Sequence, residues 1–299
     1  MTDYGRPLSF GVSIDPEATR FSSGLALAAQ ADRSGVDYLA VQDHPYQPAF
    51  LDSWTMLAFL LARSENISVV PDVLNLQLHP PTMVAKAAAS LATMSGGRVQ
   101  LGVGSGATPR GVAAMGGVPR TGDDAVAFTD EAIQVMRRAL RGGTIQADTK
   151  QHRIAGYEAG PIPPQPIEVW LGSQGRKMLA VAGRSSDGWM SPLNIYVPPE
   201  SVPERQALID ETARRDGRDP SAVRRIYNVI GEIGTSRAGT GLVGTVDHWI
   251  ETLSEWAIDL GFDTFIFWTV TDPAAQLSVF TSEVIPGVRA RVAQLRGAA

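Results

Sequence analysis

Eight short apolar segments recur along the chain, and each is followed by a turn and then by a stretch with helical periodicity. The segments are rich in Val, Ile, Leu and aromatic residues, and polar residues do not alternate through them. Such runs are typical of strands buried on both faces, which occur in parallel sheets covered by helices. We therefore predict an α/β fold, a single (β/α)8 TIM barrel, with strands at Leu8–Ile14, Val36–Gln42, Ile67–Leu74, Arg98–Val103, Ile167–Leu171, Asp187–Ser191, Arg224–Ile233 and Phe262–Trp268.

The chain has 299 residues, whereas roughly 250 are typical of one such barrel. The excess leaves room for insertions but hardly for a second domain, so we expect one domain over residues 1–299. Residues 105–122 are broken by proline and glycine, which predicts a loop on the rim of the barrel. An insertion at about residues 142–166 is expected to form a strand-and-loop excursion.

Capping residues mark the predicted helices. We expect Ser22 or Ser23 to cap a helix that ends at Gly35, and Asp52 or Ser53 to cap the next helix. The later helices are predicted at Thr82–Met94 (between Pro80-Pro81 and Gly96-Gly97), Asp123–Arg141, Gln174–Arg184, Pro199–Asp216, Val246–Leu260 and Ala274–Gln294.

Composition excludes several classes of protein. A formal net charge of -5 argues against a general binder of nucleic acids or anionic membranes. Cysteine is absent, which excludes disulfides, thiolate nucleophiles and cysteine-bound metals. No apolar secretion signal and no apolar run of about 20 residues is present. We therefore expect a cytoplasmic protein whose partner is a small-molecule substrate, with no nucleic acid and no membrane.

The candidate site residues follow the predicted strands, because barrel enzymes build their sites at the carboxyl ends of the strands. Most are glycines or small polar residues: Asp15, Asp43, His44, Asp72, Val73, Asn75, Gly104, Ser105, Gly106, Gly172, Ser173, Gln174, Gly175, Ser191, Glu232, Trp268 and Thr269. This set favours a bound planar cofactor that carries a phosphate.

Two other barrel chemistries fit the sequence poorly. Schiff-base lyases need a lysine in the pocket, and metal hydrolases need clustered ligands. The lysines fall in predicted helices or in the insertion, and the histidines match no paired ligand spacing: they are Lys86, Lys150 and Lys177, and His44, His79, His152 and His248. We predict no metal site.

Two motifs suggest specific roles on the rim. His44 either exchanges a proton or hydrogen bond with a reacting centre or hydrogen-bonds locally beside Asp43. Gly172–Gly175 lies between a strand and a helix, so its amides and the helix N-terminus would attract a phosphate, with Arg176 nearby. The alternative for this segment is a plain glycine turn.

Two further segments have competing interpretations. Gly102–Ala107 resembles a dinucleotide-binding fingerprint, but Pro109 and Gly111 keep the following stretch irregular, which favours a close approach of backbone to a ligand. Pro71 indicates a bulge in the third strand, since proline removes a ladder donor, or else an end of that strand at Val70.

With these motifs, the chain resembles the bacterial luciferase-like flavin-utilising superfamily, and most of all its short coenzyme F420-dependent oxidoreductase branch. The resemblance spans nearly the whole sequence. It rests on Ala40–His44, Leu51–Trp54, Pro80–Leu91, Ser95–Arg98, Leu101–Gly106, Trp170–Gly172, Ser186–Trp189, Phe262–Phe265 and Glu283–Pro286.

The resemblance implies a flavin or deazaflavin ring on the rim, backed by a bulge with a non-prolyl cis peptide. Asp72-Val73 matches the bulge, and His44 matches the active-site histidine near the ring centre. Asn75 and Ser105 match positions that contact the ring or its ribityl chain. The phosphate end is matched by Gly172, Ser173, Gln174, Gly175, Arg176 and Ser191. Asp43, Gly104 and Gly106 belong to the matching motifs and are expected at the cofactor.

Two positions bear on the substrate. Sugar-phosphate dehydrogenases of this branch carry a catalytic glutamate where this chain has Ala107, which speaks against a sugar substrate. Trp54 lies near the position of their catalytic tryptophan but also fits a buried helix residue.

We expect hydride transfer between F420 and a small organic substrate, in a homodimer as the resemblance suggests. The alternatives are an FMN-dependent monooxygenase and a flavin-binding barrel without turnover. An open pocket over the ring would favour catalysis, whereas loops 105–122 and 142–166 filling that space would favour binding alone.

Overall fold

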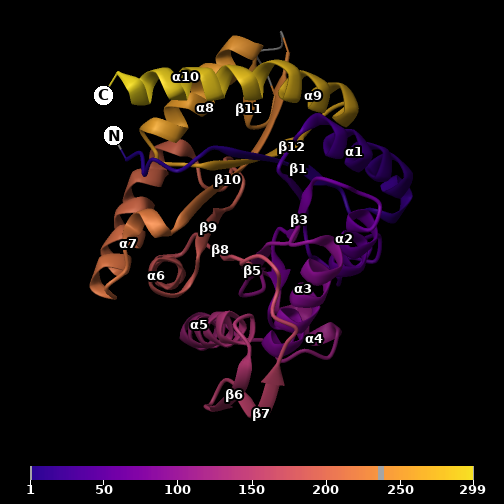
Figure 1. The fold of residues 1–299 in the computed structure, drawn as a ribbon, viewed down its shortest axis with the longest axis vertical. Helices are drawn as coiled ribbons and strands as arrows, with labels where there is room; N and C mark the ends of the chain where they lie inside the picture. The colour runs from indigo at the N-terminus through magenta and orange to yellow at the C-terminus, as the bar shows by residue number, and fades with distance from the viewer. Residues whose placement is uncertain (1, 235–238, 299) are drawn as a thin grey trace.

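The computed structural model describes residues 2–234 and 239–298. Its main sheet is parallel, in the order β3-β2-β1-β12-β10-β9-β8-β5-β4, and a bridge between Val69 and Val99 joins β3 to the segment before β5. The predicted (β/α)8 barrel is confirmed (Figure 1). The strands are β1 Ser9–Ile14, β2 Tyr38–Val41, β3 Ser68–Pro71, β4 Leu74–Asn75, β5 Leu101–Gly104, β8 Val169–Gly172, β9 Gly188–Ser191, β10 Arg224–Ile233, β11 Leu242–Gly244 and β12 Thr264–Thr269.

Helices surround the sheet, and all but the short helix of the rim loop cover its outer face. They are α1 Phe21–Ser34, α2 Ser53–Leu61, α3 Pro81–Ser95, α4 Pro109–Ala114, α5 Gly122–Ala139, α6 Arg176–Ser185, α7 Val202–Arg215, α8 Val246–Ile258, α9 Pro273–Val279 and α10 Ile285–Gly297. A π-helical turn at Phe280–Val284 joins α9 to α10, so the predicted last helix is one continuous element. Within residues 2–234 and 239–298, no helix is both long and apolar enough to cross a bilayer.

The helix caps follow the sequence with one exception. Gly35 ends α1 in the left-handed conformation, and the Asp52 carboxylate accepts the Thr55 amide at 2.7 Å to cap α2. The predicted serine cap of α1 is wrong: Arg20 is the N-cap, and Ser22 and Ser23 lie inside the helix. A 3-10 turn at Ala18–Arg20 leads directly into α1, which moves its start ahead of the serines.

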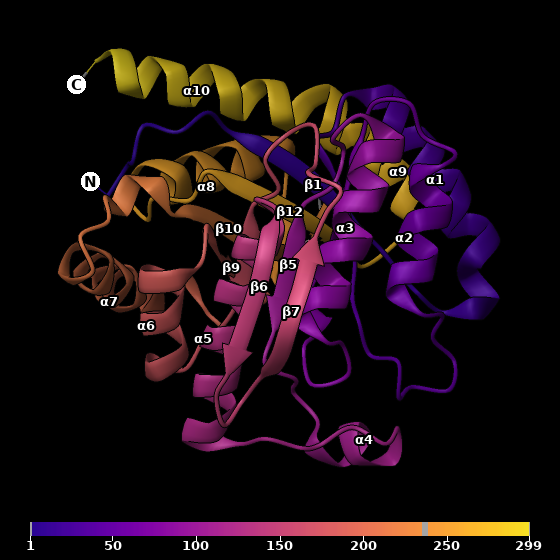
Figure 2. The ribbon, with the colours of Figure 1, turned by 60° about the horizontal axis from the view of Figure 1, so that its bottom comes forward.

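The two predicted interruptions lie outside the strands of the barrel, one on the rim and one along the helix layer. The loop 105–122 contains only the short helix α4. The insertion forms an antiparallel hairpin of β6 Gly143–Asp148 and β7 Arg153–Ala159, which runs along the outside of the barrel next to α5 (Figure 2).

Apolar side chains fill the barrel and the layer around it. Six fully buried residues pack inside the sheet: Ala40, Val70, Trp170, Met190, Ile226 and Ile266. A larger cluster lies between the sheet and the helices, where Leu57, Ile133 and Val181 are among the residues with no exposed surface. The strand residues of both clusters come from the predicted apolar segments, which explains why these segments lack polar alternation.

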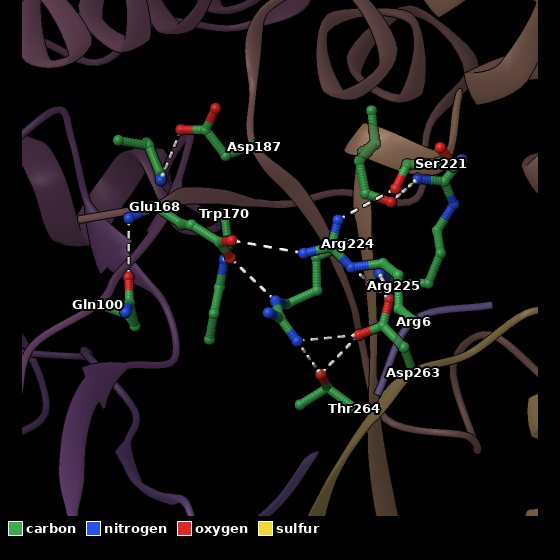
Figure 3. A network of polar contacts seen from close by, with 12 residues as sticks. Arg6, Gln100, Glu168, Trp170, Asp187, Ser221, Arg224, Arg225, Asp263 and Thr264 are labelled. Atoms are coloured by element: carbon green, nitrogen blue, oxygen red, sulfur yellow. Dashed lines mark hydrogen bonds and ion pairs between the residues drawn. The ribbon is translucent and has the colours of Figure 1, made fainter. Parts of the chain in front are cut away.

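Ion pairs hold together the amino ends of three strands (Figure 3). The Arg224 guanidinium contacts Glu168 at 2.9 Å and Asp263 at 3.2 Å, which links β10 to the segments that precede β8 and β12. The Asp263 carboxylate also accepts the Arg225 amide at 2.9 Å. This end of the barrel is therefore occupied by paired charges.

Arg225 reaches outward from β10 into the helix layer with no exposed surface. Its guanidinium donates to Asp210 on α7 at 2.8 Å and to the Val223 carbonyl at 2.6 Å. The same Asp210 carboxylate accepts a longer bond, 3.4 Å, from Arg214, whose side chain is 65% exposed. One carboxylate thus has a buried and an exposed arginine partner.

We expect Arg225→Met to lower the free energy of unfolding by about 3 kcal/mol, because it removes the buried arginine partner of Asp210. Arg214→Met should cost less than about 1 kcal/mol, because exposed pairs are screened by solvent. Urea unfolding of both variants measures the two losses. Equal losses would contradict this account of the buried pair.

Candidate functional site

A cavity of about 530 Å³ opens at the carboxyl ends of the strands, opposite the ion-paired end. It brings together all but two of the residues that the resemblance places at the active site and cofactor: Asp43, His44, Asp72, Val73, Asn75, Gly104, Ser105, Gly106, Gly172, Ser173, Gln174 and Gly175. The hairpin β6–β7 contributes no described residue to its lining, and the loop 105–122 contributes only its first residues. Neither insertion fills the mouth of the cavity.

The other two predicted residues lie outside the lining. Arg176 points to the surface, where its guanidinium pairs with Glu204 at 2.6 Å. Ser191 is fully buried at the end of β9, and its hydroxyl has no partner among the described residues. The expected cluster at the start of α6 therefore forms without the arginine side chain.

His44 follows β2 and is half-buried in the cavity wall. Its Nδ1 lies 2.7 Å from the Tyr46 hydroxyl, a group that donates or accepts and so suits either tautomer of the ring. Burial lowers the pKa of His44 below its ordinary value, and the neighbouring Asp43 partly opposes this shift. The imidazole is therefore neutral at pH 7 and can accept a proton.

Tyr46 connects His44 to the rim loop. A Cβ atom on Gly111 of α4 would lie 2.6 Å from the Tyr46 ring. Only a residue without a side chain allows the helix backbone to pack on this ring. Gly111, one of the glycines in the predicted rim loop, is thus required by its contact with Tyr46, the hydrogen-bond partner of His44.

Asp43 is buried and supports the site from behind. Its two carboxylate oxygens accept hydrogen bonds from the Ser53 hydroxyl at 2.9 Å and from the backbone amide of Asn75 at 2.8 Å. The side chain therefore joins the end of β2 to α2 and to β4. Both oxygens are used within the protein, so Asp43 acts on the cavity by positioning its neighbours.

The third strand is interrupted between β3 and β4, where the Asp72–Val73 peptide bond is cis. The strand runs through Pro71, paired with Val41, so the alternative of an end at Val70 is wrong. Val73 packs between Gly104 and Gly172, where added Cβ atoms would lie 2.7 and 2.8 Å from its Cγ2. The glycines of two strands thus make room for one valine.

Asp72 is half-buried in the cavity wall, and its carboxylate Oδ2 is fully enclosed. Its Oδ1 accepts from the Asn228 amide at 3.1 Å, while its Oδ2 has no partner among the described residues. Among the lining residues that the structure describes, none is a lysine or an arginine. Burial raises the pKa of Asp72 to about 7, so the carboxyl carries a proton below neutral pH.

Asn228 is a site residue that the sequence analysis missed. Its Oδ1 accepts from the Trp268 indole at 2.8 Å, and its Nδ2 donates to Asp72 and, at 3.0 Å, to the Ser191 carbonyl. We expected Glu232 from this strand, but β10 continues past the rim and pairs with β11 there, so Glu232 is not in the lining. The sequence did contain a signal for Asn228: it lies two positions after Ile226 in the same strand, so both side chains point into the barrel.

Gln77 was also missed, and it fixes the rim loop. Its Nε2 donates to the carbonyls of Ser105 and Arg120, and its Oε1 accepts the Arg120 amide at 2.7 Å. One buried side chain therefore ties together residues near both ends of the loop 105–122. No sequence pattern marks such a bond.

The segment Gly172–Gly175 leads into the N-terminus of α6, which no side chain caps. The Trp189 indole donates to the Ser173 carbonyl at 2.8 Å and fixes this turn. The Ser173 hydroxyl is buried, lies in the cavity lining and has no partner among the described residues. The free amides of a first helical turn and an unpaired hydroxyl are groups that bind an anion.

Trp54 and the lysines lie elsewhere. Trp54 packs against the core from α2, in agreement with the interpretation as a helix residue. Lys86 donates to the Gly160 carbonyl at 2.6 Å, and Lys150 and Lys177 pair with surface aspartates. In the described ranges, 2–234 and 239–298, no three His, Asp or Glu side chains gather as metal ligands.

Comparison with known proteins agrees with this fold. The luciferase-like monooxygenase family model matches residues 7–238. An F420-dependent glucose-6-phosphate dehydrogenase of Gordonia bronchialis is 30% identical over 55% of this chain and 51% of that protein. A 5,10-methylenetetrahydromethanopterin reductase of Archaeoglobus fulgidus is 26% identical over 60% and 52%. The chain thus spans about half the length of these curated relatives.

Solved structures share the fold over almost the whole chain. An F420-dependent secondary alcohol dehydrogenase in complex with an F420-acetone adduct has a TM-score of 0.83 at 18% identity, over 95% of this chain and 99% of that chain. The EDTA monooxygenase EmoA from Chelativorans sp. BNC1 has a TM-score of 0.81 at 15% identity, over 96% and 94%. The family match covers most of the sequence, and the chain belongs to the luciferase-like monooxygenase family.

Proposed function

We propose that this chain is an oxidoreductase that transfers a hydride between coenzyme F420 and a small organic substrate. The observation that carries the proposal is one cavity that joins a neutral histidine to an uncapped helix N-terminus with an unpaired serine hydroxyl. Relatives named as F420-dependent support the choice of deazaflavin.

The residues of the cavity fit a phosphorylated tricyclic cofactor. Ser173 and the first amides of α6 would hold the phosphate, because these donors have no acceptor within the protein. Asn75, Ser105 and Val73 would border the ring, and Gly104 and Gly172 keep Val73 in place. When bound, the deazaflavin ring supplies the carbon that gives or takes the hydride.

Side chains of the cavity exchange a proton with the substrate and set the charge around it. His44 is neutral at pH 7 and either takes the proton of a substrate hydroxyl or, once protonated, returns it to a carbonyl oxygen. Tyr46 holds Nδ1, so Nε2 is the nitrogen free for this exchange. Asp72 in its protonated form avoids an unpaired charge in the cavity wall.

Two alternatives remain as competing proposals. An FMN-dependent monooxygenase is supported by structural neighbours such as the EDTA monooxygenase. A flavin-binding barrel without turnover is less well supported, because neither insertion fills the space beside His44. The homodimer and the single-domain organisation stay predictions.

Cofactor titration tests the central proposal. We expect submicromolar binding of F420, weak or no binding of FMN, and at least about tenfold weaker binding of the F420 core without its phosphate, because the α6 contacts would be lost. Cofactor fluorescence measures all three. Tighter binding of FMN would favour the monooxygenase. If neither cofactor binds, both the F420-dependent and the FMN-dependent hypothesis are contradicted.

His44→Ala should reduce kcat by about 100-fold while the dissociation constant of the cofactor changes less than about threefold, because a proton-exchanging group is lost without a binding contact. Steady-state rates with the best substrate from a screen of alcohols and ketones give the first quantity. His248→Ala, an exposed position on α8, is the control and should behave as wild type. An unchanged kcat would remove His44 from the mechanism.

Asp72→Asn should change how stability depends on pH. A carboxyl whose pKa is raised on folding binds its proton more tightly in the folded state, so wild-type stability falls as pH rises from about 4 to about 7. Relative to wild type, the variant should gain up to about 1.4 kcal/mol per pH unit in this window and no more above it.

Urea unfolding of the ligand-free protein at pH 5, 6, 7 and 8 measures that difference, and Asp72→Ser should give the same pH dependence. A difference that does not change with pH would show that Asp72 is ionised throughout.

A further inference from the structure

A second cavity, of about 600 Å³, lies on the same rim between the ends of β1 and β12 and the helices α1 and α9. Figures 1 and 2 both show α1 beside α9 at this edge of the barrel. The Gln30 side chain on α1 donates to the Ala274 carbonyl at 2.9 Å and to Ser278 at 2.8 Å on α9. The two helices that form the walls are therefore tied together.

The second cavity adjoins the cavity of His44 and Ser173, in which we propose that the cofactor binds and which we call the cofactor cavity. Gln42, at the end of β2, and Trp268, at the end of β12, line both. Trp268 is fixed between them by its bond to Asn228. A molecule in the second cavity would therefore lie next to one in the first, with these two side chains at the shared boundary.

The lining of the second cavity is mostly apolar above a small polar floor. Leu27, Val270 and Pro273 form parts of the walls. The side chains of Ser13 and Gln42, at the ends of their strands, form no hydrogen bond with another described residue. Such a lining suits a ligand with an apolar body and one or two hydrogen-bonding groups.

The charges around the second cavity select against anions. Arg20 is the one lysine or arginine among its described lining residues, and it contacts Asp15 at 3.0 Å and Glu17 at 3.3 Å. Asp272 adds a further carboxylate, which caps α9. The arginine is thus neutralised, and an anionic ligand would face excess negative charge.

We propose that the second cavity is the substrate chamber of this enzyme and that it takes uncharged, predominantly apolar molecules with a carbonyl or hydroxyl oxygen, and excludes phosphorylated or carboxylated ones. This inference rests on the proposed function, because the cofactor cavity defines which molecule is its neighbour. Gln42, which lines both cavities, binds the oxygen of the ligand beside the cavity of His44, Ser13 adds a second polar contact, and the walls hold the apolar body.

Two matched probes test the inference: 4-methylcyclohexanone and 4-oxocyclohexanecarboxylate, which share a ring and a ketone and differ in charge. Saturation-transfer NMR titrations of the full chain, with and without F420, give their dissociation constants. We expect the uncharged ketone to bind at least tenfold more tightly than the carboxylate.

Filling the cavity should then remove this binding. Ala26→Trp on α1 and Ala274→Trp on α9 are exposed lining positions, so the indoles occupy the cavity without displacing core residues. Each should weaken ketone binding at least tenfold and leave the affinity for F420 within twofold. Ala275→Trp, an exposed neighbour outside the described lining, is the control and should retain both affinities.

The inference is overturned if the ketone does not bind, if both filling variants retain its affinity within twofold, or if the carboxylate binds as tightly. Failure of the proposed function has a separate signature: the wild type then binds neither F420 nor FMN, while the ketone titrations without cofactor still decide whether the second cavity takes uncharged ligands.

Discussion

The common direction of the strands is the constraint on which this molecule depends. Each strand of the barrel is bonded in parallel to its neighbours, so every turn that follows a strand emerges at the same rim. The opposite rim is closed by Arg224 with Glu168 and Asp263. Unpaired polar groups therefore gather at one end of the barrel, where residues distant in sequence meet around one cavity.

That cavity combines burial with few compensating charges. Asp72 has one oxygen bonded to Asn228 and one without a partner, and no described lysine or arginine lines the space around it. Because an isolated charge is costly there, the carboxyl holds its proton near neutral pH. The chain of bonds from Trp268 through Asn228 to Asp72 also links the boundary of the second cavity to the interrupted third strand.

Local signals in the sequence were sufficient to predict the barrel, its strands and most of the cavity lining. The length of each apolar segment and the turn residues after it indicate a buried parallel strand and the position of its end. They failed where a contact joins distant segments. Asn228 meets Asp72 across 156 positions, Gln77 bonds to the far end of a loop, and Arg176 turns away to Glu204. Such partners depend on strand tilt and side-chain direction, which apolar periodicity does not encode.

The packing of Gly111 against Tyr46 has a practical consequence for protein engineering. Surface positions of the same loop, such as Met115 and Val118, are 50% and 63% exposed and offer sites where diversity can be introduced to alter entry to the rim. Gly111 does not, because any larger residue would displace the Tyr46 ring, whose hydroxyl contacts the His44 imidazole. A mutant library of this loop should therefore randomise its tip and keep that glycine constant.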